Sequence, residues 1–152
     1  YCIVHQQAPT SKEVNNTDLA TGRFIHPAQN EKSFLWHNGI IKEGKFEGDW
    51  DTEWLFDLVL EDLRKSPLKR FEAGISEADG TFACMMYHGH RMFVFRNEIS
   101  PLFSNGTTFS STKFEDSIPV PPNTMWSLNF ETSVLEKKWK FETKENPYHF
   151  GE

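Results

Sequence analysis

Short apolar segments alternate with turn-forming residues in the second half of the chain, and this pattern restricts the fold more than any other feature. The segments are rich in aromatic and β-branched residues, which favour strands. The residues between them are typical of tight turns, as in Asn105-Gly106 and Pro121-Pro122. The pattern predicts an antiparallel meander. Its strands are expected over residues 81–87, 91–96, 107–112, 124–130 and 134–141.

The first half of the chain contains shorter strand candidates. The opening residues 1–5 are apolar and β-branched, and residues 23–25 and 34–37 are two more short strand candidates that contain aromatic residues. Polar stretches with proline and asparagine separate them, including a turn-like segment over residues 26–30. We therefore expect three short strands before the first helix.

One helix is expected over residues 51–66. Asp49 or Asp51 stands where an N-cap belongs, and Pro67 would end the helix. The apolar residues in this segment recur at three- and four-residue spacing, which is typical of an amphipathic helix. They are Trp54, Leu55, Leu58, Val59 and Leu63.

The length and apolar content of the chain indicate a single domain with its own core. The chain has 152 residues, of which 38% are hydrophobic and 14 are phenylalanine. We expect one domain over residues 1–152, of class α+β, in which phenylalanines fill the space between layers.

Charge and hydropathy exclude two classes of partner. The chain has 16 basic and 22 acidic residues and a net charge of −6, which would repel a nucleic-acid backbone. Its basic clusters, at residues 64–70 and 137–140, lie among acidic residues and are expected to be solvated faces. Uncharged apolar runs such as residues 81–87 are far shorter than the roughly 20 residues of a membrane span. We expect neither a nucleic-acid partner nor a membrane partner.

The cysteines and histidines give further expectations. Two cysteines, Cys2 and Cys84, cannot form a disulfide framework, and Cys84 lies in an apolar run where a buried thiol fits. This usage suggests a reducing, cytoplasmic environment. The histidines show no metal-ligand spacing, so we expect no metal and no cofactor.

Three short motifs allow two interpretations each. Asn38-Gly39 after an apolar strand is either a tight turn or an oxyanion hole, because an amide donor and a backbone N–H can point at one developing charge. Asp51 at a helix start is either a cap or a partner for a substrate ammonium group. Arg23 in a strand is either an ion-pair residue or a clamp for a substrate carboxylate.

The order of these motifs resembles the glutaminase domain of class II glutamine amidotransferases, a family of N-terminal nucleophile hydrolases. His37-Asn38-Gly39-Ile40-Ile41 is similar to the family's His-Asn-Gly-x-Ile motif, and Asp51-Thr52-Glu53 is similar to its Asp-Thr-Glu helix start. Further similar blocks follow in the family's order. The blocks lie at residues 21–27, 37–41, 51–53, 79–83, 96–102, 109–112 and 121–124.

The resemblance implies a fold and a chemistry. The fold would be a four-layer αββα sandwich of antiparallel sheets with a reduced helical layer. The substrate would be glutamine or a similar amide, with Arg23 holding the α-carboxylate and Asp51 the α-ammonium group, beside His37. Asn38 and Gly39 would stabilise the oxyanion. Cys2 would be the nucleophile, activated by its own free α-amine, and any ammonia-accepting subunit would be separate.

The sequence departs from the family pattern near Cys2. Family domains begin Cys-Gly-Ile-Val, and aligning Ile3-Val4 with that Ile-Val places Tyr1 in the cysteine position. While Tyr1 is attached, the nitrogen of Cys2 is an amide and not a base. Two functions are therefore open: a glutamine-hydrolysing domain, or an inactive amidotransferase-like fold used for binding or assembly. A hydrolase for a different amide is a further alternative.

Overall fold

The computed structural model describes residues 2–6, 25–42, 50–65 and 73–142. The predicted site residue Arg23 and the helix-ending Pro67 lie outside the described residues. The described part contains one α-helix and one 3-10 helix, α2 (Asp51–Lys65) and η1 (Gly74–Glu77). Its strands are β1 (Ala28–Gln29), β2 (Ser33–Asn38), β3 (Ala83–His88), β4 (Arg91–Arg96), β5 (Phe103–Ser104), β6 (Phe109–Ser110), β7 (Ile118–Pro119), β8 (Thr124–Asn129) and β9 (Val134–Lys140).

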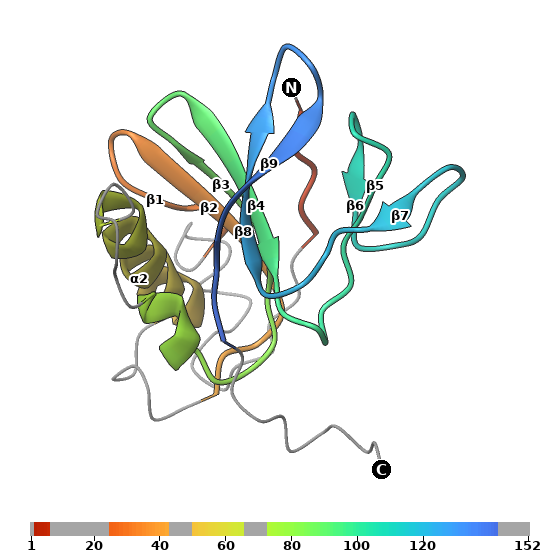
Figure 1. Cartoon of the computed structure of the whole chain (residues 1–152). Coiled ribbons are helices and arrows are strands. Elements are labelled where there is room, and N and C mark those ends of the chain that lie inside the picture. The colour runs from red at the N-terminus through yellow and green to blue at the C-terminus, as the bar shows by residue number, and fades with distance from the viewer. Residues whose placement is uncertain (1, 7–24, 43–49, 66–72, 143–152) are drawn as a thin grey trace.

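A six-stranded antiparallel sheet forms the centre of the described structure (Figure 1). Its strand order is β1-β2-β3-β4-β8-β9, so sequential strands are mostly neighbours. The tight turn between β3 and β4 uses Gly89 and His90, both at positive φ. The predicted meander is confirmed for the four strands β3, β4, β8 and β9.

A separate three-stranded sheet interrupts this meander. Its order is β6-β5-β7, and it lies between β4 and β8 in the sequence. The predicted strand over residues 107–112 was wrongly assigned to the meander, because only Phe109–Ser110 is a strand and it belongs to this second sheet. The chain leaves the main sheet at Asn97, which is buried. The Asn97 side chain donates to the Gly80 carbonyl at 2.7 Å and accepts from the Ser100 N–H at 3.2 Å.

The predicted strands at residues 1–5 and 23–25 are wrong for the residues that the structure describes. Residues 2–5 and Ile25 are outside the strands. Strand β2 pairs with β3 along its whole length and with β1 over two residues. The N-terminal segment contacts β2 through a side chain instead of a backbone ladder, as His5 Nε2 lies 3.1 Å from the carbonyl oxygen of His37.

Helix α2 confirms the prediction from apolar spacing. It begins at Asp51, which is therefore the first helical residue and not the residue before the helix. The carbonyl of Trp50 accepts the first hydrogen bonds, from the N–H groups of Glu53 at 3.1 Å and Trp54 at 3.2 Å. Leu55 and Val59 are fully buried on the face that packs against the sheet.

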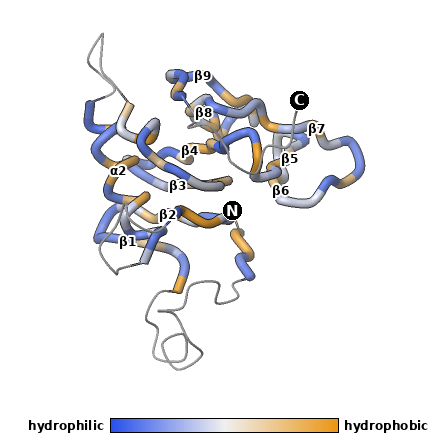
Figure 2. Tube along the Cα trace, turned by 90° about the horizontal axis from the view of Figure 1, so that it is seen from below, coloured by the Kyte–Doolittle hydropathy of each residue, from blue (hydrophilic) through white to orange (hydrophobic). Residues whose placement is uncertain are grey.

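The two faces of the six-stranded sheet carry different neighbours. One face packs on α2 through a core that includes Leu35, Phe82 and Phe95. The opposite face forms a smaller cluster, in which Met92 and Leu128 pack with residues of the β5–β7 region. Figures 1 and 2 show α2 and the three-stranded sheet on opposite sides of the main sheet.

The described fold is thus α+β, with antiparallel sheets and a helix on one face. The second helical layer of the predicted four-layer sandwich is not seen among the described residues, so the four-layer form stays a prediction. Among the helices of the described residues, none has the length and apolar character needed to cross a membrane.

A buried carboxylate joins α2 to η1, and its replacement provides a stability test. The carboxylate of Asp62 accepts the backbone N–H groups of Gly74 and Ile75, the latter at 2.9 Å, and burial raises its pKa. In Asp62→Asn one N–H would face an amide NH₂, so we expect a loss of about 1–3 kcal/mol in the free energy of unfolding by urea titration. Asp57→Asn, on the exposed face of α2, is the control and should change it by less than about 0.5 kcal/mol. Equal effects of both substitutions would contradict this account.

Candidate functional site

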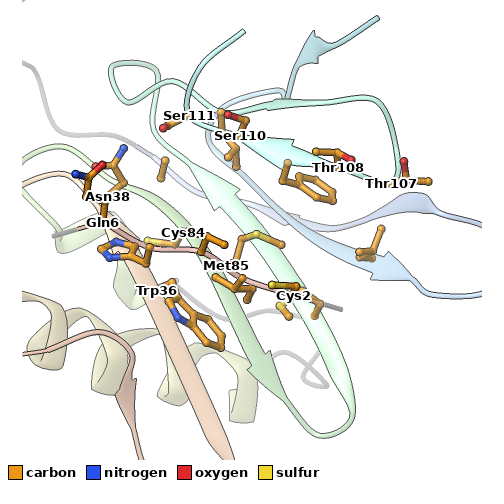
Figure 3. Close-up of a pocket in the computed structure, with 18 of the residues that line it drawn as sticks. Cys2, Gln6, Trp36, Asn38, Cys84, Met85, Thr107, Thr108, Ser110 and Ser111 are labelled. Atoms are coloured by element: carbon orange, nitrogen blue, oxygen red, sulfur yellow. The ribbon is translucent and has the colours of Figure 1, made fainter. Parts of the chain in front are cut away.

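A pocket of about 600 Å³ lies on the sheet face opposite α2 (Figure 3). The N-terminal segment 2–6 forms one side of it, and residues 107–111 around β6 form another. The central strands supply the floor, including Trp36 from β2, Met85 from β3 and Met92 from β4. Such a volume is in the range of small-molecule sites.

Two of the predicted catalytic residues, Cys2 and Asn38, line this pocket. Cys2 is exposed, and the Asn38 side chain is exposed and makes no hydrogen bond to another described residue. Figure 3 shows the two residues apart, towards opposite ends of segment 2–6. His5 is held next to the end of β2, and the three residues from Cys2 to His5 span at most about 10 Å. The thiol and the amide therefore share a pocket without being adjacent.

Side-chain alternation along β2 explains why Asn38 faces the pocket and His37 does not. Successive side chains of a strand point to opposite faces. Leu35 and His37 face α2 and are buried, whereas Trp36 and Asn38 face the pocket. The predicted substrate-binding residue His37 is thus placed behind the pocket wall.

His37 belongs to a hydrogen-bonded chain with Thr52 and His26. Its Nε2–H donates to the carbonyl of Thr81 at 3.1 Å, which leaves Nδ1 as the acceptor for the Thr52 hydroxyl at 3.0 Å. The Thr52 oxygen in turn lies 3.3 Å from His26 Nε2 and accepts its proton. These contacts assign His37 as a neutral imidazole with the proton on Nε2.

His5, in the N-terminal segment 2–6, stacks on His26. Their ring centroids are 4.0 Å apart, and the His26 ring also meets Trp50 edge-on at 4.8 Å. His5 Nε2–H donates to the His37 carbonyl at 3.1 Å, while its Nδ1 is buried without a partner in the described part of the chain. The stack ties segment 2–6 to the start of the Asn38-Gly39 turn.

Burial favours the neutral forms of His26 and His37. Burial and the neighbouring His5 and His37 lower the pKa of His26 to about 3. Burial also lowers the pKa of His37, although the nearby Asp51 carboxylate opposes that shift. The His26 and His37 rings are 6.4 Å apart, so charging both would place two cations close together and raise the energy of each.

Gly39 has a backbone conformation and a close contact that require glycine. Its φ is +138°, and a Cβ there would lie 2.1 Å from the carbonyl oxygen of Thr81. Gly80 lies on the crossing segment with φ +150°, and a Cβ there would lie 2.2 Å from the Ile40 carbonyl oxygen. The segments around Gly39 and Gly80 cross here, and the Thr81 N–H donates to the Ile40 carbonyl at 2.9 Å. This crossing fixes the backbone after Asn38.

Asp51 is placed near this crossing but does not line the pocket. One oxygen of its carboxylate accepts the Ile41 N–H at 2.9 Å, and the other accepts the Thr52 N–H at 2.8 Å. The side chain therefore ties the start of α2 to the segment after Gly39. A carboxylate has further lone pairs, so these bonds leave acceptor capacity.

The sequence patterns predict no functional role for His5. They also predict none for the hydroxyl residues of the pocket rim, Thr107, Thr108, Ser110 and Ser111. A histidine three residues after Cys2 gives no signal until the fold stacks it on His26. Cys84 was predicted to be a buried thiol, and this is confirmed, since burial raises its pKa well above the usual value.

Comparisons with known proteins do not show the family of this chain. No protein-family model matches the chain, and no curated protein matches it. Among solved structures, it is similar to a glutamine aminotransferase class-II domain protein from Silicibacter pomeroyi, with 14% identity and a TM-score of 0.48. The similarity covers 77% of this chain and 71% of that protein.

Proposed function

We propose that the chain is an amidotransferase-like domain that binds an amide in the Cys2–Asn38 pocket and hydrolyses it through the Cys2 thiol. The observation that carries the proposal is that the pocket brings together an exposed thiol and a side-chain amide that has no hydrogen-bond partner among the described residues. The ordered motifs at residues 37–41 and 51–53 support the same function. The substrate in this proposal is glutamine or a similar primary amide.

The proposed reaction has two steps. The thiolate of Cys2 attacks the amide carbon, and the Asn38 amide and the Gly39 N–H stabilise the oxyanion. The C–N bond then breaks, ammonia leaves with a proton from the protonated α-amine, and a thioester remains. Water hydrolyses the thioester to the carboxylic acid and restores the thiol.

This chemistry sets two requirements for the N-terminal segment. The Tyr1–Cys2 peptide bond must be cleaved, because only a free α-amine, with a pKa of about 7.7–8.0, can take the thiol proton near neutral pH. The reacting carbon must also lie about 3 Å from both the thiol and the oxyanion donors. Segment 2–6 would have to bring Cys2 closer to Asn38.

Other parts of the proposal come from the family resemblance. The β6-β5-β7 sheet would correspond to a shortened second sheet of a four-layer sandwich. Arg23 would hold the α-carboxylate of glutamine, and the free acceptor capacity of Asp51 would hold the ammonium group. The domain would work in the cytoplasm, alone or with a separate subunit that accepts ammonia.

Binding without hydrolysis is the second candidate function. It is favoured by the separation of Cys2 from Asn38 in Figure 3. It is also favoured by the peptide bond that joins Tyr1 to Cys2 in this sequence, since that bond removes the base. The same pocket would then hold an amide ligand without cleaving it.

Ammonia release from glutamine distinguishes these functions. A chain starting at Cys2 should release ammonia, whereas the chain that retains Tyr1 should not. Cys2→Ala should abolish release, and Asn38→Ala should lower kcat by about 10²–10³-fold. Asp57→Asn, an exposed change on α2 outside the 51–53 motif, is the control and should leave the rate unchanged. No release from the chain that starts at Cys2, with the fold intact by circular dichroism, would overturn hydrolysis of glutamine.

A further inference from the structure

Apolar side chains from several elements converge on the floor and walls of the Cys2–Asn38 pocket. Met85, Met92 and Leu128 come from three adjacent strands, β3, β4 and β8. Leu102 and Phe109 come from the β5–β6 region. This lining continues the smaller of the two hydrophobic clusters into the cavity.

We infer that this pocket selects amides with an apolar body, such as unbranched acyl amides, over free glutamine. The inference rests on the proposed function only in taking the ligand to be an amide. An apolar chain would lie along Met85 and Leu128, and its amide would reach Asn38. Burying such a chain removes apolar surface from water, which favours binding.

The polar groups of the pocket fit a neutral head group. The described lining includes the amides of Asn38 and Gln6, the His5 imidazole and the hydroxyls of Thr107, Thr108, Ser110 and Ser111. It includes no aspartate, glutamate, lysine or arginine among the described residues. Free glutamine carries an ammonium and a carboxylate group, and placing either against an apolar wall without a partner costs free energy. The Asp51 carboxylate lies outside the described lining.

The size of the pocket supports a ligand longer than glutamine. A volume of about 600 Å³ is the space of about 20 water molecules in the liquid. Glutamine alone would leave much of that space to water against the half-buried side chains of Met85 and Phe109. An extended acyl chain would fill it.

Protection of Cys2 from alkylation tests the inference on the whole chain. Cys2 is exposed and lines the pocket, whereas the Cys84 thiol is buried. N-ethylmaleimide should therefore label Cys2 selectively, and mass spectrometry can follow the rate. The probes are acetamide, butanamide, hexanamide and glutamine, each added over a concentration series.

We expect protection to strengthen with chain length, by up to about fourfold in apparent affinity for each added methylene group. Hexanamide should protect at lower concentrations than glutamine. Met85→Gln, which puts an amide in the apolar lining, should reduce the gain per methylene, and Met85→Leu should retain it. Both substitutions leave the Cys2 and Asn38 side chains themselves unchanged.

The outcomes separate this inference from the proposed function. Chain-length-dependent protection without ammonia release would support the pocket's specificity and refute hydrolysis. Ammonia release from glutamine with no gain from longer acyl chains would keep hydrolysis and overturn the apolar selectivity. Equal protection by all four amides, or by none of them, would also overturn it.

Discussion

Gly39→Ala is expected to lower the free energy of unfolding by at least about 3 kcal/mol. The added Cβ would lie 2.1 Å from the Thr81 carbonyl oxygen and 2.6 Å from its carbon, which are backbone atoms that cannot rotate away. Alanine also disfavours the φ of +138° that this residue adopts. Urea unfolding followed by tryptophan fluorescence measures the loss.

Gly89→Ala is the matched control for that substitution. Gly89 has a positive φ of +57° in the β3–β4 turn, but an added Cβ would meet no atom within 4 Å. Gly89→Ala should lower the free energy of unfolding only by the strain of placing alanine in a left-handed conformation, about 1–2 kcal/mol. If Gly39→Ala were as stable as Gly89→Ala, the close approach of the Thr81 backbone to Gly39 would be contradicted.

Acidification is expected to destabilise the fold below pH 6.5 through the buried imidazoles. The pKa of His26 is lowered to about 3 in the folded state, while an unfolded histidine titrates near 6.5. Between these values the unfolded chain binds the proton that the folded chain refuses, so stability is present above pH 6.5 and is lost as the pH falls. His26 alone should contribute about 1–2 kcal/mol of loss between pH 6.5 and pH 5, allowing for its part exposure.

Comparing variants isolates this contribution from other titrating groups. His26→Gln should lose less stability than the wild type over the same pH interval, because one proton-linked group is removed. His90→Asn, in the exposed β3–β4 turn, should keep the slope of the wild type. The measurement is the free energy of unfolding of the wild type and both variants at pH 5, 6 and 7. Identical slopes for His26→Gln and the wild type would mean that the His5–His26 stack opens before the chain unfolds.

Local patterns in the sequence predict much of the fold. Helix α2 begins at the predicted Asp51 because its apolar residues repeat with helical spacing. Strand β4 matches its predicted bounds, 91–96, because a Gly-His turn and a run of apolar residues define it locally. Strands β8 and β9 differ from their predicted ends by one residue each.

Long-range contacts explain what the sequence patterns miss. Residues 2–5 have strand-like composition, yet a side chain of His5 contacts β2 in place of their backbone. The two-residue strands β5 and β7 are too short to give an alternating pattern, and Asn97 directs the chain towards them through distant contacts with Gly80. Such contacts have no signature in the residues nearby.

The candidate site is predictable where it rests on a local motif, and it is not predictable where it depends on long-range contacts. The motif at residues 37–41 identifies Asn38 and Gly39, and the structure places Asn38 in a pocket with Cys2. The sequence does not reveal that His37 faces the core, or that Asp51 is bonded to Ile41, because both depend on how β2 meets α2. The roles predicted for these residues stay predictions.

Strand β2 uses one face for the core and the other for the pocket, and this restricts how the chain can change during evolution. Substitutions at Trp36 or Asn38 can alter the pocket while Leu35 and His37 keep the core intact. Deleting or inserting one residue would instead exchange the two sets, because side chains alternate along a strand. Related chains should therefore differ in the identity of these residues and not in the number of residues within β2, from Ser33 to Asn38.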